Sequence, residues 1–266
     1  MPRRDDIHKV LIIGSGPIVI GQACEFDYSG TQACKALRSL GYEIVLVNSN
    51  PATIMTDPGT ADATYIEPLN LKILTEIIAK ERPDALLPNL GGQSGLNLSS
   101  DLHQAGVLTE YGVKVIGVNI DAIQRGEDRQ TFKETMNRLG IEMAKSDVVN
   151  KVADAETVAE KLGYPVVIRP AYTMGGGGGG LVYNIEELRT VASRGLAASR
   201  VNQVLVEESV LGWEELELEV VRDAKNQMIT VCFIENVDAM GVHTGDSYCT
   251  APMLTIAPAL QKKLQD

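Results

Sequence analysis

The stretch that decides the fold reads VVIRPAYTMGGGGGGLVY and spans residues 166–183. Two apolar runs enclose six consecutive glycines, and together they indicate the two strands of a hairpin. Ordering each glycine costs about 0.5–1 kcal/mol more than ordering an alanine, so the run opposes folding unless something holds it. Backbone N–H groups without neighbouring side chains suit a polyanion such as a triphosphate. We therefore interpret residues 175–180 as a mobile loop that covers phosphates.

A plain linker and a Walker A loop are the two other interpretations of the glycines. A linker is usually flanked by polar, low-complexity residues, whereas Arg169 within an apolar run leads into these glycines. A Walker A loop needs Lys followed by Ser or Thr after its last glycine, but Leu181 follows Gly180. The flanks favour the phosphate loop over both.

Length, charge and composition bound the class of protein. The 266 residues are 44% hydrophobic, and 24 basic against 35 acidic residues give a net charge of −11. The length suits one large or two modest domains, and the negative charge argues against nucleic acid as a partner. No apolar stretch reaches the roughly 18 residues that cross a bilayer, so we expect a cytoplasmic protein without a membrane partner. The four cysteines and three histidines lack the spacing of a metal site or a disulfide framework.

Residues 9 to 125 alternate short apolar runs with amphipathic stretches, the pattern of an open, Rossmann-like α/β sheet. We predict parallel strands at 9–13, 43–47, 84–87 and 113–116, and helices at 31–40, 71–80 and 94–104.

The loop after the first strand begins like a dinucleotide fingerprint, with Gly14 and Gly16. Val19 stands where the third glycine belongs, and Asn48 stands where an acidic ribose ligand is expected. Both departures speak against an NAD-dependent oxidoreductase.

The pattern changes near residue 126, where we place the boundary between domains 1–125 and 126–266. Beyond it we predict a helix at 127–139, a helix capped by Asp154, the glycine hairpin, a helix capped by Asn184 with Glu187, and a strand at 203–207. Together they describe an α+β lid over about 150–210. The strands predicted at 215–220 and 228–234 are antiparallel, because acidic and aliphatic residues alternate along the first of them.

Two arginines could neutralise a triphosphate under the glycines. Arg169 precedes them on the same hairpin, and Arg129 begins a helix, although a surface salt bridge is the alternative for each. Where the lid ends, the backbone from Glu208 to Val210 could offer the donor and acceptor that an adenine edge needs. His243 could donate to a phosphate.

One of three alternating glutamates could hold the ribose hydroxyls. The alternative is that Glu215, Glu217 and Glu219 form the solvent-exposed face of a sheet, and the pattern does not choose among them.

Six blocks of sequence resemble the first half of the large subunit of carbamoyl phosphate synthetase. They lie at residues 14–30, 48–57, 81–84, 91–93, 173–176 and 238–247, so the likeness covers essentially the whole chain. The resemblance implies a Rossmann-like pre-ATP-grasp domain with a parallel sheet, followed by an ATP-grasp domain that is truncated within its antiparallel-sheet body. The chain is then expected to be an N-terminal fragment.

The family resemblance also implies a reaction. That half is expected to phosphorylate bicarbonate with ATP to carboxyphosphate, which ammonia from a glutaminase small subunit converts to carbamate. A homologous second half then phosphorylates carbamate, so the intact enzyme is an ATP-dependent carbon–nitrogen ligase and a hetero-oligomer. Its product serves arginine or pyrimidine biosynthesis, and the sequence does not choose between these pathways.

Residues carried over from the family fall on the positions already singled out. The implied ATP contacts are Arg129, Arg169, Met174, Gly175, Gly176, Glu208, Val210, Glu215, Gly241, Val242 and His243, with Arg129, Arg169 and His243 as catalytic residues. This set selects Glu215 among the three glutamates.

The chain departs from the family in two ways. Gly178 stands near the place of a small polar residue, and the magnesium or manganese ligands of the family fall beyond residue 266. We therefore expect no metal site in this chain and no turnover by it alone. The alternatives are a non-catalytic nucleotide-binding or subunit-docking module and a different ATP-grasp ligase.

Overall fold

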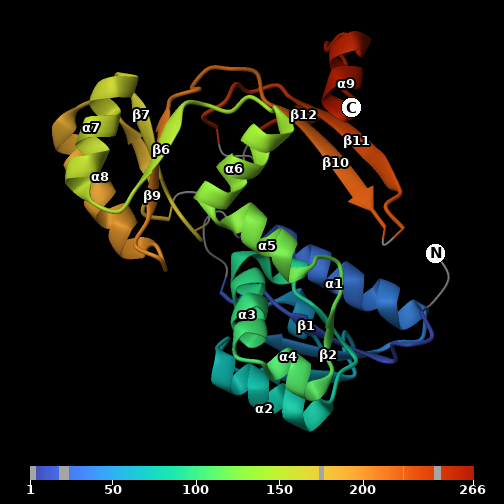
Figure 1. Ribbon diagram of the computed structural model, residues 1–266. Coiled ribbons are helices and arrows are strands. Elements are labelled where there is room, and N and C mark those ends of the chain that lie inside the picture. The colour runs from blue at the N-terminus through green and yellow to red at the C-terminus, as the bar shows by residue number, and fades with distance from the viewer. Residues whose placement is uncertain (1–3, 18–23, 174–176, 224, 243–246) are drawn as a thin grey trace. The chain divides into compact units, whose positions relative to one another are not determined.

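The computed structural model describes residues 4–17, 24–173, 177–223, 225–242 and 247–266 (Figure 1). Its backbone divides into two compact units, Met1–Glu207 and Glu208–Asp266, called unit 1 and unit 2 below. Over the described ranges, no helix combines the length and apolar character that crossing a bilayer requires.

Unit 1 begins with a five-stranded parallel sheet in the order β3-β2-β1-β4-β5. In register, Leu11 of β1 lies between Val45 of β2 and Leu86 of β4. The predicted open α/β sheet is confirmed, and it gains one strand, β3, that the sequence pattern did not show. The strands are β1 (Lys9–Ile13), β2 (Glu43–Asn48), β3 (Ala63–Ile66), β4 (Ala85–Leu87) and β5 (Lys114–Val115).

Helices cover both faces of this sheet because successive strand residues point to opposite faces. Leu11 and Val45 pack with α2 (Leu71–Glu81), α3 (Gly92–Gln104) and α4 (Val107–Tyr111). On the other face, Ile12 and Ile44 pack with α1 (Cys24–Ser39), which Figure 1 shows across the sheet from α2. Two short 3₁₀ turns, Ile54–Thr56 and Asn89–Gly91, complete this part of the unit.

Asn48, which had argued against a dinucleotide site, holds the loop after β1 together. Its side chain is fully buried, and its Oδ1 accepts hydrogen bonds from the backbone N–H groups of Gly16 at 3.1 Å and Asn50 at 3.2 Å. A Cβ at Gly14 would lie 2.5 Å from the Asn48 side-chain nitrogen. Gly14 therefore makes room for Asn48, and Asn48 is occupied within the protein.

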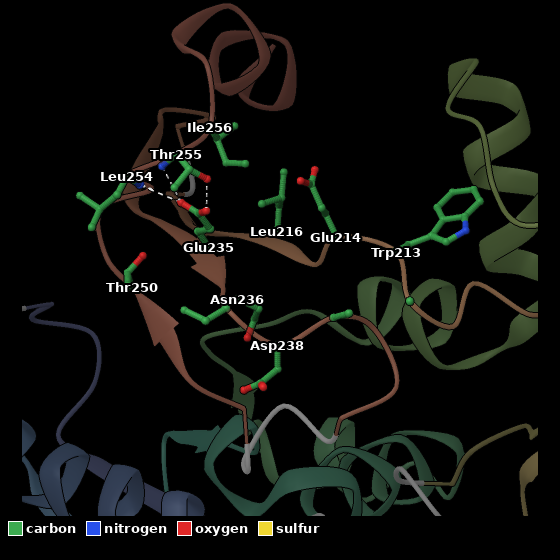
Figure 2. A pocket seen from close by; sticks show the side chains of 13 residues that line it. Trp213, Glu214, Leu216, Glu235, Asn236, Asp238, Thr250, Leu254, Thr255 and Ile256 are labelled. Carbon is green, nitrogen blue, oxygen red and sulfur yellow. Dashed lines mark hydrogen bonds between the residues drawn. The ribbon is translucent and has the colours of Figure 1, made fainter.

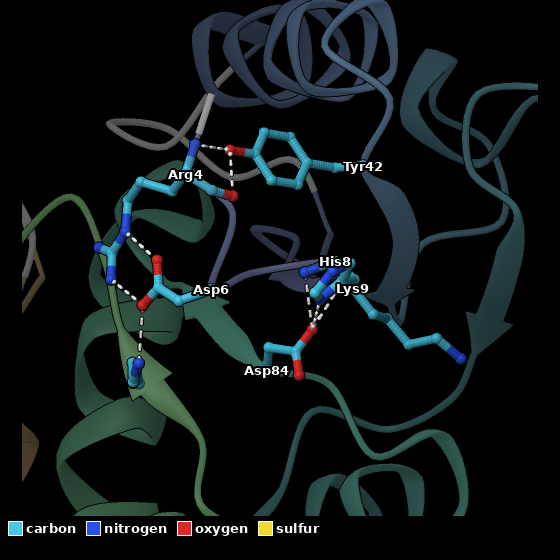
Figure 3. Close-up of polar contacts among 7 residues, drawn as sticks. Arg4, Asp6, His8, Lys9, Tyr42 and Asp84 are labelled. Atoms are coloured by element: carbon cyan, nitrogen blue, oxygen red, sulfur yellow. Dashed lines mark hydrogen bonds and ion pairs between the residues drawn. The ribbon is translucent and has the colours of Figure 1, made fainter. Parts of the chain in front are cut away.

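Polar contacts fasten the opposite edge of the sheet, where the strands begin (Figure 3). Asp84 Oδ2 accepts from the backbone N–H groups of His8 at 2.7 Å and Lys9 at 2.9 Å. The hydrogen bond from Lys9 and then that from His8 hold the pKa of Asp84 below its ordinary value. Beside it, Asp6 lies 2.7 Å from both Arg4 and Lys114.

The second half of unit 1 has a four-stranded sheet in the order β6-β9-β7-β8, with α7 and α8 packed on one face. Its glycine hairpin is confirmed, since Val166 pairs with Val182 and Ile168 with Gly180 in antiparallel register. The elements are α5 (Ile120–Glu127), α6 (Arg129–Leu139), β6 (Ser146–Val149), α7 (Val152–Leu162), β7 (Val166–Pro170), β8 (Gly180–Val182), α8 (Ile185–Ala198) and β9 (Val204–Glu208), the last of which reaches unit 2.

One of the two predicted helix caps in this sheet is confirmed and one is wrong. Asn184 Oδ1 accepts from Glu187 N at 2.9 Å, and the Glu187 carboxylate accepts from Tyr183 N at 2.8 Å. Asp154 is not the cap, because Lys151 immediately precedes the first residue of α7 and Asp154 lies in the first turn of that helix. There its negative charge still interacts favourably with the positive end of the helix dipole.

Unit 2 is a three-stranded antiparallel sheet followed by a short helix. The strands β10 (Leu216–Arg222) and β11 (Met228–Asn236) form a hairpin whose register shifts after Glu219, and β12 (Cys249–Thr250) pairs with the end of β11. Helix α9 (Pro258–Gln265) begins with proline, whose missing N–H needs no partner at that position.

Candidate functional site

Arg129 is the first residue of α6, and its neighbour Asp128 fixes the start of that helix by accepting from Thr131 N at 2.7 Å. The Arg129 Nε is buried and has no hydrogen-bond partner among the described residues. Burial, followed by the nearby charge of Arg169, lowers the pKa of Arg129 from its ordinary value. Arg129 is therefore a partly buried cation next to a second cation.

Arg169 lies on β7, beside β9 in the sheet, and its Nη1 is 3.2 Å from Glu207 Oε1. The Glu207 side chain is only 9% exposed, whereas that of Arg169 is 48% exposed. Sequence reasoning missed Glu207. The sequence did carry one signal: Glu207 directly continues the buried apolar run of β9. A buried carboxylate needs a cationic partner.

We call Arg129, Arg169 and Glu207 the arginine cluster. The charge of Glu127 also acts on Arg129, so two carboxylates lie near the two guanidinium groups. The buried Arg129 Nε has no hydrogen-bond partner in the described chain, and a buried donor is stabilised by a group that accepts from it. Arginine's planar fork matches carboxylate and phosphate oxygens. The cluster is therefore a candidate site for an anion.

Within the described part of the glycine run, residues 177–180, close packing holds Gly178 and Gly179. Gly178 has a φ of +75°, and a Cβ there would lie 2.7 Å from Ala198 Cβ. A Cβ at Gly179 would lie 2.5 Å from the Ile168 carbonyl oxygen. These two glycines are required by the fold itself, which revises the interpretation of the whole run as ligand-facing backbone. Met174, Gly175 and Gly176 lie outside the described residues.

Unit 2 brings together several residues that the sequence had singled out. A Cβ at Gly241 would meet Leu211 Cδ1 at 2.3 Å, and two backbone hydrogen bonds, from Gly212 to Met240 and from Met240 to Trp213, join the two segments. Val210 and the pair Gly241–Val242 therefore lie on adjoining loops. The Val210 carbonyl already accepts from Trp213 N at 3.1 Å, which leaves one lone pair for a ligand.

The three alternating glutamates differ in their surroundings. Glu215 Oε2 is buried and has no hydrogen-bond partner within the described chain. Glu217 Oε1 accepts from Asn236 Nδ2 at 2.6 Å, and Glu219 is exposed. Among the three glutamates, Glu215 is thus the one with a buried oxygen that lacks a hydrogen-bond partner in the described chain. His243 lies outside the described residues.

A cavity of about 310 Å³ in unit 2 contains none of the predicted site residues (Figure 2). Trp213, Leu216 and Leu254 line it, and Figure 2 shows Glu235 bonded to Thr255 at its edge. The Thr255 hydroxyl and backbone N–H, and then Leu254 N, lower the pKa of Glu235. Its carboxylate is thus committed to the 254–255 turn. In the described parts of the chain, no three His, Cys, Asp or Glu side chains gather as a metal site would require.

Solved structures with the same fold are nucleotide-binding carboxylases and synthetases. The biotin carboxylase domain of Hydrogenobacter thermophilus 2-oxoglutarate carboxylase, in complex with MgADP, ADP and bicarbonate, matches with a TM-score of 0.73 at 22% identity, over 97% of this chain and 56% of its own. Staphylococcus aureus N5-carboxyaminoimidazole synthetase, complexed with ADP, matches with a TM-score of 0.66 at 20% identity, over 97% of this chain and 61% of its own. The chain therefore has the ATP-grasp fold.

The sequence comparisons give the family. The carbamoyl phosphate synthase preATP-grasp domain matches residues 6–125, and the ATP binding domain of the carbamoyl-phosphate synthase L chain matches residues 128–266. The chain belongs to the carbamoyl phosphate synthase large-chain family.

Curated relatives of this family are considerably longer than the chain. All 266 residues align at 59% identity with the carbamoyl phosphate synthase large chain of Archaeoglobus fulgidus, and they span 25% of that protein. They align at 58% identity with the N-terminal section of the Aquifex aeolicus large chain and span 48% of it.

Proposed function

We propose that this chain binds ATP for the phosphorylation of bicarbonate, the first step of carbamoyl phosphate synthesis. The observation that carries the proposal is the arginine cluster, in which a partly buried guanidinium with no partner at its buried Nε in the described chain lies beside a second one. The membership of an ATP-binding family and the nucleotide and bicarbonate in the Hydrogenobacter relative add support.

The proposed reaction proceeds in two displacements. A bicarbonate oxygen attacks the γ-phosphorus of ATP, and the bond to the bridging oxygen breaks to give carboxyphosphate and ADP. Ammonia nitrogen then attacks the carboxyphosphate carbon, and loss of phosphate and a proton gives carbamate. Positive groups fixed around the phosphates stabilise the charge that moves to the leaving oxygen. Arg129 and Arg169 would supply this charge, and His243 would donate to a phosphate oxygen.

The remaining predicted residues would bind the rest of the nucleotide. The loop with Met174, Gly175 and Gly176 would cover the phosphates, while Glu208 and Val210 would meet the adenine edge. Glu215 would accept the ribose hydroxyls through its unpartnered oxygen. Gly241 and Val242 would contact the nucleotide from the adjoining loop.

The proposal for the whole protein follows from its family. Magnesium or manganese would neutralise the β- and γ-phosphates, with protein ligands that the resemblance places beyond residue 266. The partners would be ammonia, a glutaminase subunit that releases it from glutamine, and a second phosphorylating half in a cytoplasmic hetero-oligomer. The isolated chain would bind ATP without turning it over.

Titration calorimetry with a non-hydrolysable ATP analogue and magnesium tests the binding. We expect binding by the chain and at least tenfold weaker binding by Arg129→Gln, with Arg125→Gln, an exposed arginine paired to Asp121 at 2.6 Å, as the matched control. Equal binding by both variants and the unaltered chain would contradict the assigned phosphate site. Bicarbonate-dependent ATP hydrolysis by the chain alone would contradict the expected lack of turnover.

A further inference from the structure

Helix α8 contacts the glycine loop at its C-terminal end. Arg194 Nη2 donates to the Gly179 carbonyl at 3.1 Å, and the backbone there is close enough that a Cβ at Gly195 would lie 3.2 Å from the Gly178 oxygen. With Ala198 against Gly178, the last two turns of α8 form the support of residues 178–179. Residues 178–179 and this end of α8 are therefore packed against each other.

The turn that follows α8 is also fixed. Ser199 is buried, its Oγ accepts from Gln203 N at 3.2 Å, and its carbonyl accepts from Asn202 N at 3.1 Å. Arg200 projects from this turn, so any force on its side chain is transmitted to the end of α8.

Arg200 links this turn to the first sheet. Its Nη2 lies 2.6 Å from Asp101 Oδ1, and Asp101 belongs to α3, whose neighbouring residues Leu98 and Leu102 are buried against the parallel sheet. The Arg200 guanidinium also lies over the ring of Tyr172, 5.9 Å from its centroid. The ion pair thus joins two sheets that are far apart in sequence.

Tyr172 gives this contact a second route to the loop. It stands shortly before the glycines and has a φ of +58°, which is uncommon for an aromatic residue. A cavity of about 380 Å³ opens beside Tyr172 and Arg200, so the two halves of unit 1 are not packed solidly here. The ion pair of Arg200 with Asp101 lies beside this open space, and Gln93 Nε2 of α3 donates to Glu127 Oε2 of α5 at 2.6 Å across the same junction.

We propose that Arg200 is a positioning residue whose ion pair with Asp101 holds the end of α8, and with it residues 178–179 of the glycine loop, in place. The proposal rests on the proposed function, in which the glycine loop covers the phosphates of ATP. Breaking the pair would leave the fold of each sheet intact and loosen the loop.

Hydrogen exchange of residues 177–182 without nucleotide tests the contact directly. We expect Arg200→Gln and Asp101→Asn to raise exchange about fivefold, since that factor corresponds to about 1 kcal/mol, the upper range for a partly exposed ion pair. The charge-swapped double variant Asp101→Arg with Arg200→Asp should recover slower exchange. The effect should shrink at high salt, which screens exposed charges.

The matched control is the ion pair of Arg189 with Glu156, 2.7 Å apart, which joins α8 to α7 within the same sheet layer. Arg189→Gln should leave exchange of the loop unchanged. Loop exchange in Arg200→Gln equal to that of the unaltered chain would overturn the positioning role.

Calorimetry with the non-hydrolysable ATP analogue provides the functional readout. Arg200→Gln should weaken binding by about the same factor as it raises exchange, whereas unchanged affinity despite faster exchange would overturn the link to the nucleotide. Failure of the unaltered chain to bind would instead refute the proposed function, and the exchange result would still decide the contact.

Discussion

Gly179 is a position in the described part of the glycine run where a side chain would meet backbone. A Cβ there would lie 2.5 Å from the Ile168 carbonyl oxygen, which is backbone and cannot swing away, whereas a Cβ at Gly180 would meet nothing closer than Val191 Cγ1 at 3.7 Å. Packing therefore requires glycine at position 179 but leaves room for a side chain at position 180.

Alanine substitution at these two positions separates packing from flexibility. Gly179→Ala should destabilise unit 1 by about 1–3 kcal/mol because the hairpin must shift. Gly180→Ala should be neutral or stabilise by up to about 1 kcal/mol, since it removes freedom from the unfolded chain. Urea unfolding of both variants measures the difference, and equal effects would contradict the packing at Gly179.

Glu207 is the carboxylate that pairs with Arg169 in the arginine cluster. Glu207→Gln should destabilise the chain by about 1–3 kcal/mol, since it removes the carboxylate paired with Arg169 and one of the two that act on Arg129. Adding Arg129→Met in the same chain should recover part of this loss, and inorganic triphosphate should stabilise Glu207→Gln more than the unaltered chain. Thermal unfolding with and without triphosphate would show this, and no recovery in the double variant would contradict charge repulsion as the cause.

At this scale the sequence predicted the cations better than their surroundings. Arg129 and Arg169 stood out because each adjoins a motif, and the structure places them close enough for repulsion to lower the pKa of Arg129. Glu207 was missed because its partner lies 38 residues away in sequence. Periodicity shows which residues are buried, but not which strands become neighbours.

Elements with a continuous apolar run or a clear cap were predicted best. Strands β1 and β2 were recognised because they are buried on both faces, whereas β3 was missed because its residues alternate between half-buried and exposed. Helix α1 begins seven residues before its predicted start at Thr31. Gly30, just before the predicted start, lies inside the helix, where a Cβ would be 2.4 Å from Met55 Cε.

The two helices of the second sheet allow a matched test of capping. Asn184→Ala at the start of α8 should destabilise unit 1 by about 1 kcal/mol, because the Glu187 N–H loses its acceptor. Lys151→Ala at the start of α7 should change little, since Lys151 makes no side-chain capping bond. Chemical denaturation of both variants measures this, and an equal loss would argue against a capping role for Asn184.

Acid should destabilise the whole molecule through carboxylates in both units. Asp84 and Glu81 in unit 1 and Glu235 in unit 2 all have a pKa below the ordinary value, held there first by Lys9 N, the Tyr65 hydroxyl and the Thr255 hydroxyl. A lowered folded-state pKa contributes stability that is present above the unfolded-state value, about pH 4, and is lost as the pH falls through the folded-state value.

Thermal unfolding between pH 7 and pH 2.5 checks this dependence. We expect a flat melting temperature down to about pH 5 and a fall below about pH 4. Asp84→Asn keeps an oxygen for the His8 and Lys9 N–H groups but does not titrate, so its melting temperature should fall less steeply in acid. An unchanged slope in this variant would remove Asp84 from the explanation.

The pairing of β7 with β8 also limits how the glycine run can vary in length. Ile168 is opposite Gly180 and Val166 is opposite Val182, so the strand pairing fixes the register of the residues from Gly180 onward. Gly178 and Gly179 are then fixed by Ala198 and by the Ile168 carbonyl. A one-residue slip would turn Val182 out of the core, so an inserted or deleted glycine must be absorbed ahead of Gly178. Homologous chains can therefore differ in the number of glycines only on the Met174 side.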